Sequence, residues 1–270
     1  MTRKQVSDLD ETTVLNRLRT SSLGRALLIV SECSSTNDIA HNAAAEGAPH
    51  GFTVVTEEQT MGRGRHGASW LSPRGGIWMT TVLRPPRVCA ALNALPLIGA
   101  LAIARTARAS LGIQAFVRWP NDVVLNNRKV AGVLVETRFE GDRLEFALLG
   151  LGINANFHTS QLRDLAEKSV TLMDACGSPI QRAPFISSLL QEVEEIYDLA
   201  RLGKTAYILR WVRQLDWSRG KRVVIRLGGS TSTGIMDGYE SLTKIRLVVK
   251  QRSLLTVETD SVIAVDYVDA

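Results

Sequence analysis

Short apolar runs separated by turn residues dominate the first part of the chain. Runs rich in Val, Ile, Leu and Thr between turn residues are typical of β-strands. Such runs predict strands over residues 26–30, 52–56, 77–83, 115–119, 129–137 and 144–150. The last two runs flank Glu140-Gly141-Asp142, a turn sequence, and therefore predict a hairpin.

Between these runs, the apolar residues recur at helical spacing. Val14, Leu15 and Leu18 predict one short amphipathic helix near the start of the chain. The sequence Ser-Ser-Thr-Asn at 34–37 supplies N-capping side chains. It predicts an alanine-rich helix that ends near Gly47.

The longest apolar stretch, residues 88–104, predicts a buried helix rather than a membrane span. It holds 17 positions, six of them alanine, and includes Asn93, Pro96 and Gly99. A bilayer span needs about 20 strongly apolar residues. We therefore predict a helix over 93–111 inside the protein and no transmembrane segment.

The pattern changes in the last third of the chain. A further helix opens at Pro184, and after Trp217 short β-branched runs broken by glycines begin. These runs predict strands over 222–227, 232–239, 245–249, 253–258 and 262–267. Such short, closely spaced strands are typical of a small β-barrel. We expect an α+β fold, with a mixed β-sheet flanked by helices over 1–216 and a separate barrel over 217–270.

The composition is that of an ordinary folded protein. Of the 270 residues, 45% are hydrophobic and 22% are charged, which excludes disordered, collagen-like and coiled-coil proteins. Cys33, Cys89 and Cys176 lie far apart without a C-x-x-C motif, so neither a disulfide framework nor a zinc site is expected. This cysteine usage suits a reducing, cytosolic compartment. The polar start of the chain is not that of a secretory signal.

Positive charge is concentrated in two segments. The chain has 32 Lys and Arg against 27 Asp and Glu, a formal net charge of +5. Residues 61–90 hold five arginines and no acid, and residues 201–226 hold eight bases and one acid. Such segments attract polyanions, which include nucleic acid, nucleotide phosphates and acidic proteins. For the second segment, a solvated basic face is an equal alternative.

Residues 62–67, Gly-Arg-Gly-Arg-His-Gly, satisfy the G-x-G-x-x-G pattern of dinucleotide-binding folds. That pattern needs a helix directly after the glycines and an acid about 20 residues later. Here Ala-Ser-Trp-Leu-Ser-Pro follows, and no acid occurs between Glu58 and Asp122, so a Rossmann site is excluded. A glycine loop remains that can bring amides and two arginines onto an anion, with an ordinary turn as the alternative. Trp70 fits either a core residue or a stacking surface.

Two further polar segments interrupt the predicted sheet. Arg118-Trp119-Pro120-Asn121-Asp122 follows a strand, and Lys129 stands at the start of the next apolar run. By itself this segment is an ordinary turn, and Lys129 could guard a sheet edge. Gly150-Leu151-Gly152-Ile153-Asn154 places glycines within a strand, which indicates either a closely approaching ligand or a bulge.

Taken in order, these motifs resemble those of the biotin protein ligases. The series comprises Ser-Ser-Thr-Asn, Gln59, the glycine loop with Trp70, Trp-Pro-Asn-Asp with a lysine seven residues on, and Gly-x-Gly-Ile-Asn. It covers residues 26 to about 160, and the combination is far more specific than any single member. The resemblance implies a class II synthetase-like catalytic domain followed by an SH3-like barrel.

The resemblance also implies a role for each matching residue. Biotin is expected to contact Ser35, Thr36, Asn37, Gln59, Gly62, Arg63 and Lys129. The nucleotide is expected to contact Arg63, Arg65, Trp70, Asn121 and Asn154. The catalytic residues are expected to be Lys129, Arg65 and Asp122, and a Mg²⁺ ion is expected beside Asn121 and Asp122.

The implied reaction has two steps and takes place in the cytoplasm. Biotin and ATP first form biotinyl-5′-AMP and pyrophosphate, and a lysine of a biotin carboxyl carrier protein then displaces AMP. No protein nucleophile is needed, because the catalyst mainly neutralises and aligns two anions. The segment before residue 26 is too short for a three-helix DNA-reading module, so neither operator DNA nor a membrane is an expected partner. A homodimer formed through the sheet is left open.

Two alternatives differ from this interpretation. Lipoate ligases and octanoyltransferases have the same catalytic fold and also use a lysine, but they lack the combination of the glycine–arginine loop and Trp-Pro-Asn-Asp. A basic nucleic-acid-binding protein without catalysis is suggested by the isoelectric point of about 9.3. Against it, aromatic residues, which RNA-binding surfaces use for stacking, make up only 6% of the chain.

Overall fold

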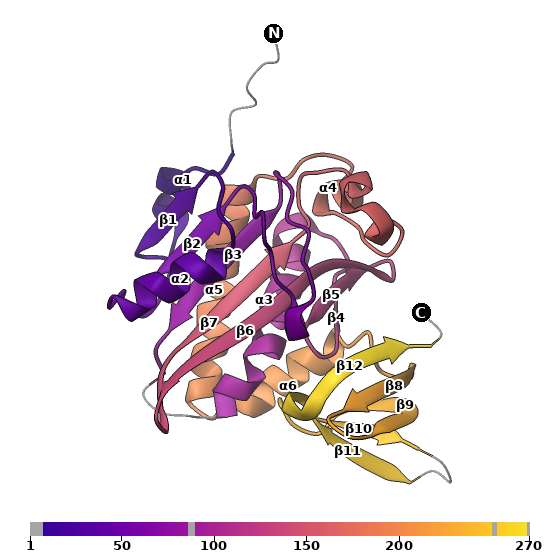
Figure 1. Cartoon of the computed structure of the whole chain (residues 1–270). Helices are drawn as coiled ribbons and strands as arrows, with labels where there is room; N and C mark the ends of the chain where they lie inside the picture. Colours follow the sequence, from indigo (N-terminus) through magenta and orange to yellow (C-terminus); the bar gives the residue numbers. More distant parts are fainter. Residues whose placement is uncertain (1–7, 86–89, 250–252, 269–270) are drawn as a thin grey trace.

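The computed structural model describes residues 8–85, 90–249 and 253–268. It contains a seven-stranded mixed sheet with the order β1-β2-β3-β7-β6-β5-β4 and a five-stranded antiparallel sheet with the order β11-β10-β9-β8-β12 (Figure 1). The strands of the first sheet are β1 (Leu27–Val30), β2 (Thr53–Thr56), β3 (Ile77–Leu83), β4 (Phe116–Arg118), β5 (Asp122–Leu125), β6 (Arg128–Glu140) and β7 (Arg143–Ile153). The second sheet comprises β8 (Arg222–Leu227), β9 (Thr231–Tyr239), β10 (Lys244–Val248), β11 (Leu254–Glu258) and β12 (Val262–Tyr267).

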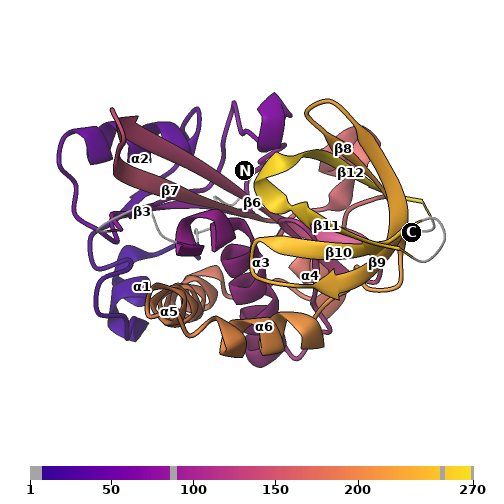
Figure 2. The same cartoon turned by 90° about the horizontal axis from the view of Figure 1, so that it is seen from below.

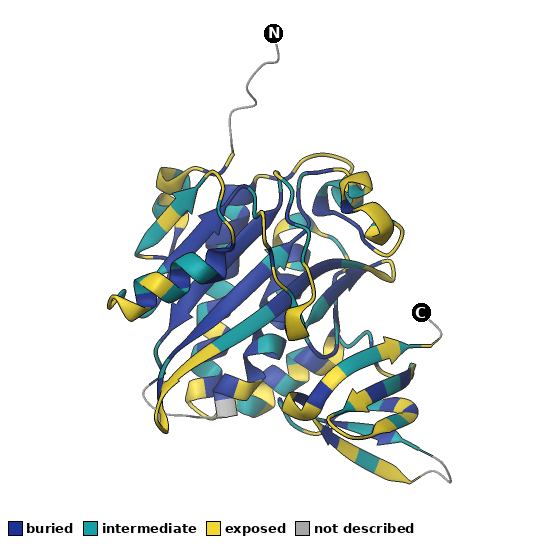
Figure 3. Ribbon diagram, viewed as in Figure 1, coloured by how far each residue is buried: buried dark blue, intermediate teal, exposed yellow. Residues whose placement is uncertain are grey.

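Helices cover both faces of the seven-stranded sheet. They are α1 (Glu11–Arg17), α2 (Thr36–Ala45), α3 (Ala90–Leu111), α4 (Leu172–Cys176), α5 (Arg182–Arg201) and α6 (Thr205–Gln214). Figure 2 shows α2 on one side of the sheet and α3, α5 and α6 on the other. Every residue of β3 is buried, as a strand covered on both faces requires. The dark band of buried residues along β3, β7 and the first half of β6 marks this covered part (Figure 3).

The apolar helix α3 lies in the core, as its sequence predicts. Its span 91–111 is long and apolar enough to cross a membrane by length and composition alone. However, 67% of the apolar 18-residue window within this span is buried inside the protein. A helix that is apolar on all sides needs protein around it or a membrane, and here α5 and the sheet surround it. At Gly99, a side chain would lie 3.0 Å from Leu151 and Val133, so the helix backbone packs closely on β6 and β7.

The strands of the second sheet lie close to the predicted ranges. Residues 215–217, which precede β8, connect this sheet to the first one. Val117 in β4 accepts a hydrogen bond from the Trp217 amide at 2.9 Å, and its own amide donates to Leu215 at 2.8 Å. Buried residues of both sheets belong to one hydrophobic cluster. The boundary near residue 216 stays a prediction, because a continuous core does not mark where one domain ends.

Three elements were not predicted from the sequence. β5 is only four residues long and lies between two turns, so its apolar pattern is too short to recognise. Asp122 is thus the first residue of a strand rather than part of a turn. α4 is only five residues long. In α6 only Ile208 and Val212 are buried, and basic residues stand between and beside them in the sequence. The helix predicted from Pro184 begins two residues earlier, at Arg182.

The cysteines and the first basic segment are only partly within the described residues. Cys33 and Cys176 are free cysteines, whereas Cys89 and Arg87 lie outside the described residues. Arg84 donates to the backbone oxygens of Ala44 and Ala48, so it ties loops together rather than adding to a free basic surface.

Candidate active site

A cavity of about 1150 Å³ lies over the sheet, between α2, the loop that joins β2 to β3, and β12. We call residues 57–76 of that connection the substrate loop. All of the residues expected to contact biotin, the nucleotide or Mg²⁺ line this cavity, except Gly62. Gly62 lies just behind the wall, where a side chain would come within 2.3 Å of the Trp70 carbonyl oxygen. The structure thus brings motifs that are far apart in the sequence to one place.

The N-terminus of α2 orients Gln59 in the cavity. Ser35 caps the helix by accepting a hydrogen bond from the Asn37 amide. The Thr36 amide and hydroxyl donate to Gln59 Oε1 at 2.8 and 3.1 Å. Gln59 Nε2 donates in turn to Ser72 Oγ at 2.8 Å, across the substrate loop. Both ends of the Gln59 amide are therefore fixed.

A line of buried polar side chains extends from Thr36 beneath the cavity. The hydroxyls of Thr36 and Thr80 lie 2.7 Å apart, and the Thr80 hydroxyl donates to Asn37 Oδ1 at 2.5 Å. Asn37 Nδ2 then donates to Glu136 Oε2 at 2.9 Å. Gly150 leaves room for this line, since a side chain there would lie 2.8 Å from Asn37 Oδ1. This end of the cavity is polar, and Arg63 lies at its rim.

Sequence analysis did not find Thr80 or Glu136. Thr80 lies in the middle of an apolar strand, where threonine is a common strand residue. Only its burial next to Asn37 reveals its part in the hydrogen-bonded line. Glu136 lies in the second half of β6, and its contact with Asn37 depends on the pairing of β6 with β7.

Arg63 faces carboxylates of the protein. Its guanidinium contacts Asp38 at 2.7 Å and Glu136 at 3.6 Å, and 37% of its side chain is exposed. Its hydrogen bond lowers the pKa of Asp38 below the usual range. To reach an anionic ligand in the cavity, Arg63 has to exchange these partners.

Arg65 connects the substrate loop to the second sheet. Its Nη2 donates to the Val262 carbonyl oxygen at 2.8 Å, and its Nη1 lies 3.4 Å from Asn121 Oδ1. Burial lowers the pKa of the Arg65 guanidinium, and Asp122 nearby opposes that shift. Arg65 therefore lines the cavity near the Asp122 carboxylate.

Asp122 is held between two cations. Its Oδ1 lies 2.7 Å from Lys129 Nζ, and its Oδ2 lies 2.8 Å from Arg118 Nη2. Burial alone would raise the pKa of Asp122, but Lys129 and Arg118 hold it below the usual value. Asp122 is therefore ionised at neutral pH and is a weak base.

The pair Asn121 and Asp122 does not fit a resident metal site. Both Asp122 oxygens are already paired with cations, and Asn121 Nδ2 donates to the Val133 carbonyl oxygen at 2.8 Å. Among the described residues, no group of three or more His, Cys, Asp or Glu side chains could hold a metal ion. A hard divalent cation prefers several free oxygen ligands. We therefore assign no resident metal ion to these two side chains.

Trp70 lies across the two glycine-containing strands at the centre of the cavity. Added side chains at Gly132 and Gly152 would come within 3.0 and 2.8 Å of its ring. The Lys129 ammonium lies 4.9 Å from the ring centre, within the range of a cation–π interaction. Trp70 Nε1 is buried and has no hydrogen-bond partner in the described part of the chain. The glycines thus make a platform for this ring.

Asn154 and β12 complete the cavity. Asn154 is buried and donates to the Val170 and Lys129 carbonyl oxygens at 3.3 and 3.4 Å, which fixes the segment beside Lys129. Residues 263–267 of β12 form part of the wall. No sequence motif indicates this contribution, because the contact depends on how the two sheets lie together.

The two ends of the cavity differ chemically. One end has neutral, buried hydrogen-bonding groups, and the other has Arg65, Arg118 and Lys129 near the Asp122 carboxylate. Such a cavity suits a molecule with an uncharged polar ring at one end and an anion at the other. The cationic end can also neutralise a second anion brought beside the first.

Comparison with known proteins relates the chain to one family. Residues 30–154 match the model of the biotin/lipoate A/B protein ligase family. The bifunctional ligase/repressor BirA of Bacillus spizizenii is 36% identical over 211 residues, which cover 77% of this chain and 65% of that protein. The biotin–[acetyl-CoA-carboxylase] ligase of Mycobacterium tuberculosis is 28% identical over 272 residues, which cover 94% and 95% of the two chains. The chain thus spans about 65% of the length of the Bacillus relative.

A solved structure shows the same fold. The biotin protein ligase of Aquifex aeolicus, in complex with biotin and ATP, superposes with a TM-score of 0.78 at 23% identity and covers 90% of this chain and 99% of that one. This confirms the expected mixed sheet with a small C-terminal β-domain. With the matching motifs gathered in one cavity, we conclude that the chain belongs to the biotin/lipoate A/B protein ligase family.

Proposed function

We propose that the protein is an ATP-dependent biotin protein ligase that biotinylates a lysine of a biotin carboxyl carrier protein through biotinyl-5′-AMP. The observation that carries this proposal is the cavity itself, with neutral hydrogen-bonding groups at one end, Lys129 and Arg65 at the other, and Trp70 between them. Two relatives support it, since their names state biotin–[acetyl-CoA-carboxylase] ligase activity.

The neutral end suits the ureido ring of biotin. Ser35, Thr36 and Gln59 offer donors and acceptors whose directions are already fixed by hydrogen bonds within the protein. An uncharged ring binds best to such preorganised groups in a dry pocket. We assign Asn37 a positioning role, because both ends of its amide are engaged by Thr80 and Glu136.

In the first step, a carboxylate oxygen of biotin attacks the α-phosphorus of ATP. A new oxygen–phosphorus bond forms, the bond to the β-phosphate oxygen breaks, and pyrophosphate leaves. Lys129 and Arg65 neutralise the carboxylate and the α-phosphate, which otherwise repel each other. Mg²⁺ enters as part of the ATP substrate. Trp70, Asn121 and Asn154 border the space for the nucleoside.

In the second step, the lysine amine of the acceptor attacks the carbonyl carbon of the mixed anhydride, and AMP leaves with the anhydride oxygen. The amine loses a proton to solvent water as the amide forms. Asp122 is a weak base because two cations hold its pKa down. We therefore assign Asp122 the orientation of Lys129 and of the incoming amine rather than proton removal.

The nucleic-acid alternative has less support in the structure. In the basic segment 201–226, Arg226 pairs with Asp266 at 2.5 Å and Arg213 donates to the Tyr239 carbonyl oxygen at 3.0 Å. Arg201 pairs with Asp198 at 3.5 Å. Acidic partners reduce the net positive charge that a phosphate backbone would meet, and a carbonyl partner occupies a donor of the guanidinium.

The test is biotin-dependent exchange of labelled pyrophosphate into ATP, with lipoate and octanoate assayed in parallel. The ligase proposal predicts exchange with biotin that exceeds the exchange with either fatty-acid substrate. Exchange with lipoate alone would instead assign the chain to the other branch of its family. Salt-sensitive oligonucleotide binding without any exchange would support the nucleic-acid alternative.

A further inference from the structure

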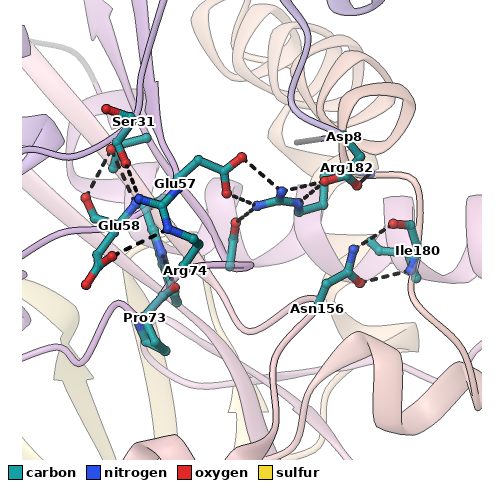
Figure 4. Close-up of polar contacts among 12 residues, drawn as sticks. Asp8, Ser31, Glu57, Glu58, Pro73, Arg74, Asn156, Ile180 and Arg182 are labelled. Carbon is teal, nitrogen blue, oxygen red and sulfur yellow. Dashed lines mark hydrogen bonds and ion pairs between the residues drawn. The ribbon is translucent and has the colours of Figure 1, made fainter. Parts of the chain in front are cut away.

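One arginine contacts both ends of the substrate loop. Arg182 Nη1 donates to Glu57 Oε2 at 2.8 Å and to the Gly76 carbonyl oxygen at 3.0 Å, and Nη2 donates to Glu57 Oε1 at 3.1 Å. Glu57 is the first residue of the substrate loop and Gly76 is its last. Figure 4 shows the guanidinium of Arg182 between Glu57 and Asp8, at the start of α5.

The contact is buried and bidentate. The side chains of Arg182 and Glu57 are 5% and 7% exposed. Burial alone would lower the pKa of the Arg182 guanidinium, but hydrogen bonds to Glu57 and Asp8 raise it above the ordinary value. A planar guanidinium can hold a carboxylate and a carbonyl oxygen together, which a lysine ammonium on a flexible stem does less well.

Arg182 is itself held in place by two neighbours. The Asp8 carboxylate accepts hydrogen bonds from the Arg182 amide at 2.9 Å and from its Nε at 2.6 Å. Ile180 lies two residues before Arg182, and its backbone exchanges hydrogen bonds with the Asn156 side chain at 2.7 and 2.9 Å (Figure 4). The Asn156 amide also donates to the Gly75 carbonyl oxygen at 2.7 Å. The start of α5 is therefore a fixed support for the exit of the loop.

We call the two ends of the substrate loop, at Glu57 and Gly76, its stems. Gln59 and Trp70, which the loop presents to the cavity, lie close to these stems in the sequence. Gln59 is two residues beyond Glu57, and its amide donates to the Ser72 carbonyl oxygen at 3.1 Å. The Trp70 amide donates to the Gly62 carbonyl oxygen at 2.9 Å. The other ion pair at the stems, Arg74 with Glu58, is longer, at 3.7 Å, and half-exposed. Most of the buried charge that fixes the stems is thus on Arg182 and Glu57.

We propose that Arg182 is a positioning residue, which sets the places of Gln59 and Trp70 in the cavity by holding both stems of the substrate loop. Arg182 is not among the described residues that line the cavity. The consequence for biotin affinity rests on the function proposed above, whereas the consequence for the loop does not.

The first test measures hydrogen–deuterium exchange of the loop without any substrate. Arg182→Lys keeps the charge but loses the planar fork, so we expect amides of residues 57–76 to exchange about tenfold faster, with strands β8 to β12 unchanged. Glu57→Gln, which loses the charge but keeps the size, should accelerate the same peptides. Loop exchange equal to that of the wild type in both variants would overturn the proposal, and so would an equal acceleration throughout the chain.

Arg105→Lys is the matched control. Arg105 also belongs to a half-buried pair with a glutamate of α5, Glu192 at 2.7 Å, but it lies on α3, away from the substrate loop. We expect this variant to leave the exchange of residues 57–76 unchanged. An acceleration there as large as that of Arg182→Lys would show that any lost pair on α5 loosens the loop, and would contradict a specific role for Arg182.

The second test separates positioning from general stability. In Arg182→Lys we expect the KM for biotin to rise about tenfold with kcat within about twofold, because preorganised binding is lost and the reacting groups remain. A merely structural role would lower the amount of active enzyme, and hence the apparent kcat, with KM unchanged; that result would overturn the proposal. If the loop loosens in the variant while the wild type shows no biotin-dependent exchange of pyrophosphate, the proposed function fails and the role of Arg182 in the loop stands.

Discussion

The Lys129 ammonium lies 4.9 Å from the centre of the Trp70 ring, so a cation and an aromatic face bound the same part of the cavity. The same ammonium contacts Asp122 at 2.7 Å. Asp122 holds it in place, and the ring restricts it to one side. Lys129 is therefore prepositioned for an anion before any ligand arrives, which is the form of electrostatic catalysis that costs little reorganisation.

Lys129→Met should abolish most of the first step. The variant removes one of the cations proposed to neutralise the carboxylate and the α-phosphate, and we expect biotin-dependent pyrophosphate exchange to fall about 100-fold or more. Lys221→Met is the matched control, because Lys221 also lies over a tryptophan, 4.4 Å from the Trp217 ring, but does not line the cavity. Equal losses in both variants would contradict the role of Lys129.

Arg65→Gly should loosen the closure of the cavity. The change removes the hydrogen bond from the substrate loop to Val262 and the contact with Asn121. We expect biotinyl-5′-AMP to dissociate about tenfold faster or more and to label nearby lysines indiscriminately, as mass spectrometry of bystander proteins can show. Arg74→Gly makes the same change in the same loop outside the cavity and should keep acceptor selectivity. If the Arg65 variant also kept selectivity and slow release, its assigned role would be wrong.

Much of this site could be predicted because its chemistry lies in local motifs. The cap at Ser35, the glycine loop and the hairpin that carries Gly150 and Gly152 each have a sequence signal of their own. Thr80 and Arg182 have none. Their roles depend on which strands and helices become neighbours, and a threonine in a strand or an arginine near a helix start is ordinary in isolation.

The partners of charged side chains were also beyond prediction. No acidic partner of Arg63 can be recognised from the sequence, yet Arg63 pairs with Asp38 from α2 and Glu136 from β6. Asp122, which the resemblance places beside Mg²⁺, pairs with Lys129 and Arg118. Charge can be counted from a sequence, but its neutralisation is decided by tertiary contacts.

The stability of the protein should depend on pH through Asp216. Burial raises the pKa of this carboxyl from 3.8 to about 6. The folded chain therefore binds the proton more tightly than the unfolded chain, so the contribution of Asp216 to stability is fully present below about pH 4. It is lost as the pH rises through 6.

Asp216→Asn should test this directly. The amide keeps an oxygen to accept the hydrogen bond from the Ser218 amide, now 2.8 Å long, and carries no charge. We expect the variant to be more stable than the wild type at pH 7.5, by on the order of 2 kcal/mol, with a difference that shrinks toward pH 4. Urea unfolding across this pH range measures it, and a difference independent of pH would count against a raised pKa.

Gly152→Ala should act on the nucleotide through Trp70. An added Cβ would lie 2.8 Å from Trp70 Nε1 and 2.9 Å from Cε2, closer than side chains tolerate, so the ring must move off its platform. We expect the KM for ATP to rise about tenfold, while overpacking costs about 1–2 kcal/mol of stability. Gly228→Ala, where a Cβ meets nothing within 4 Å, should change neither quantity. In a Trp70→Leu background the added methyl has a smaller neighbour, so the effect of Gly152→Ala on KM should largely disappear; such non-additivity is the mark of two residues in contact. Additive effects would mean that Gly152 acts on the ligand without Trp70.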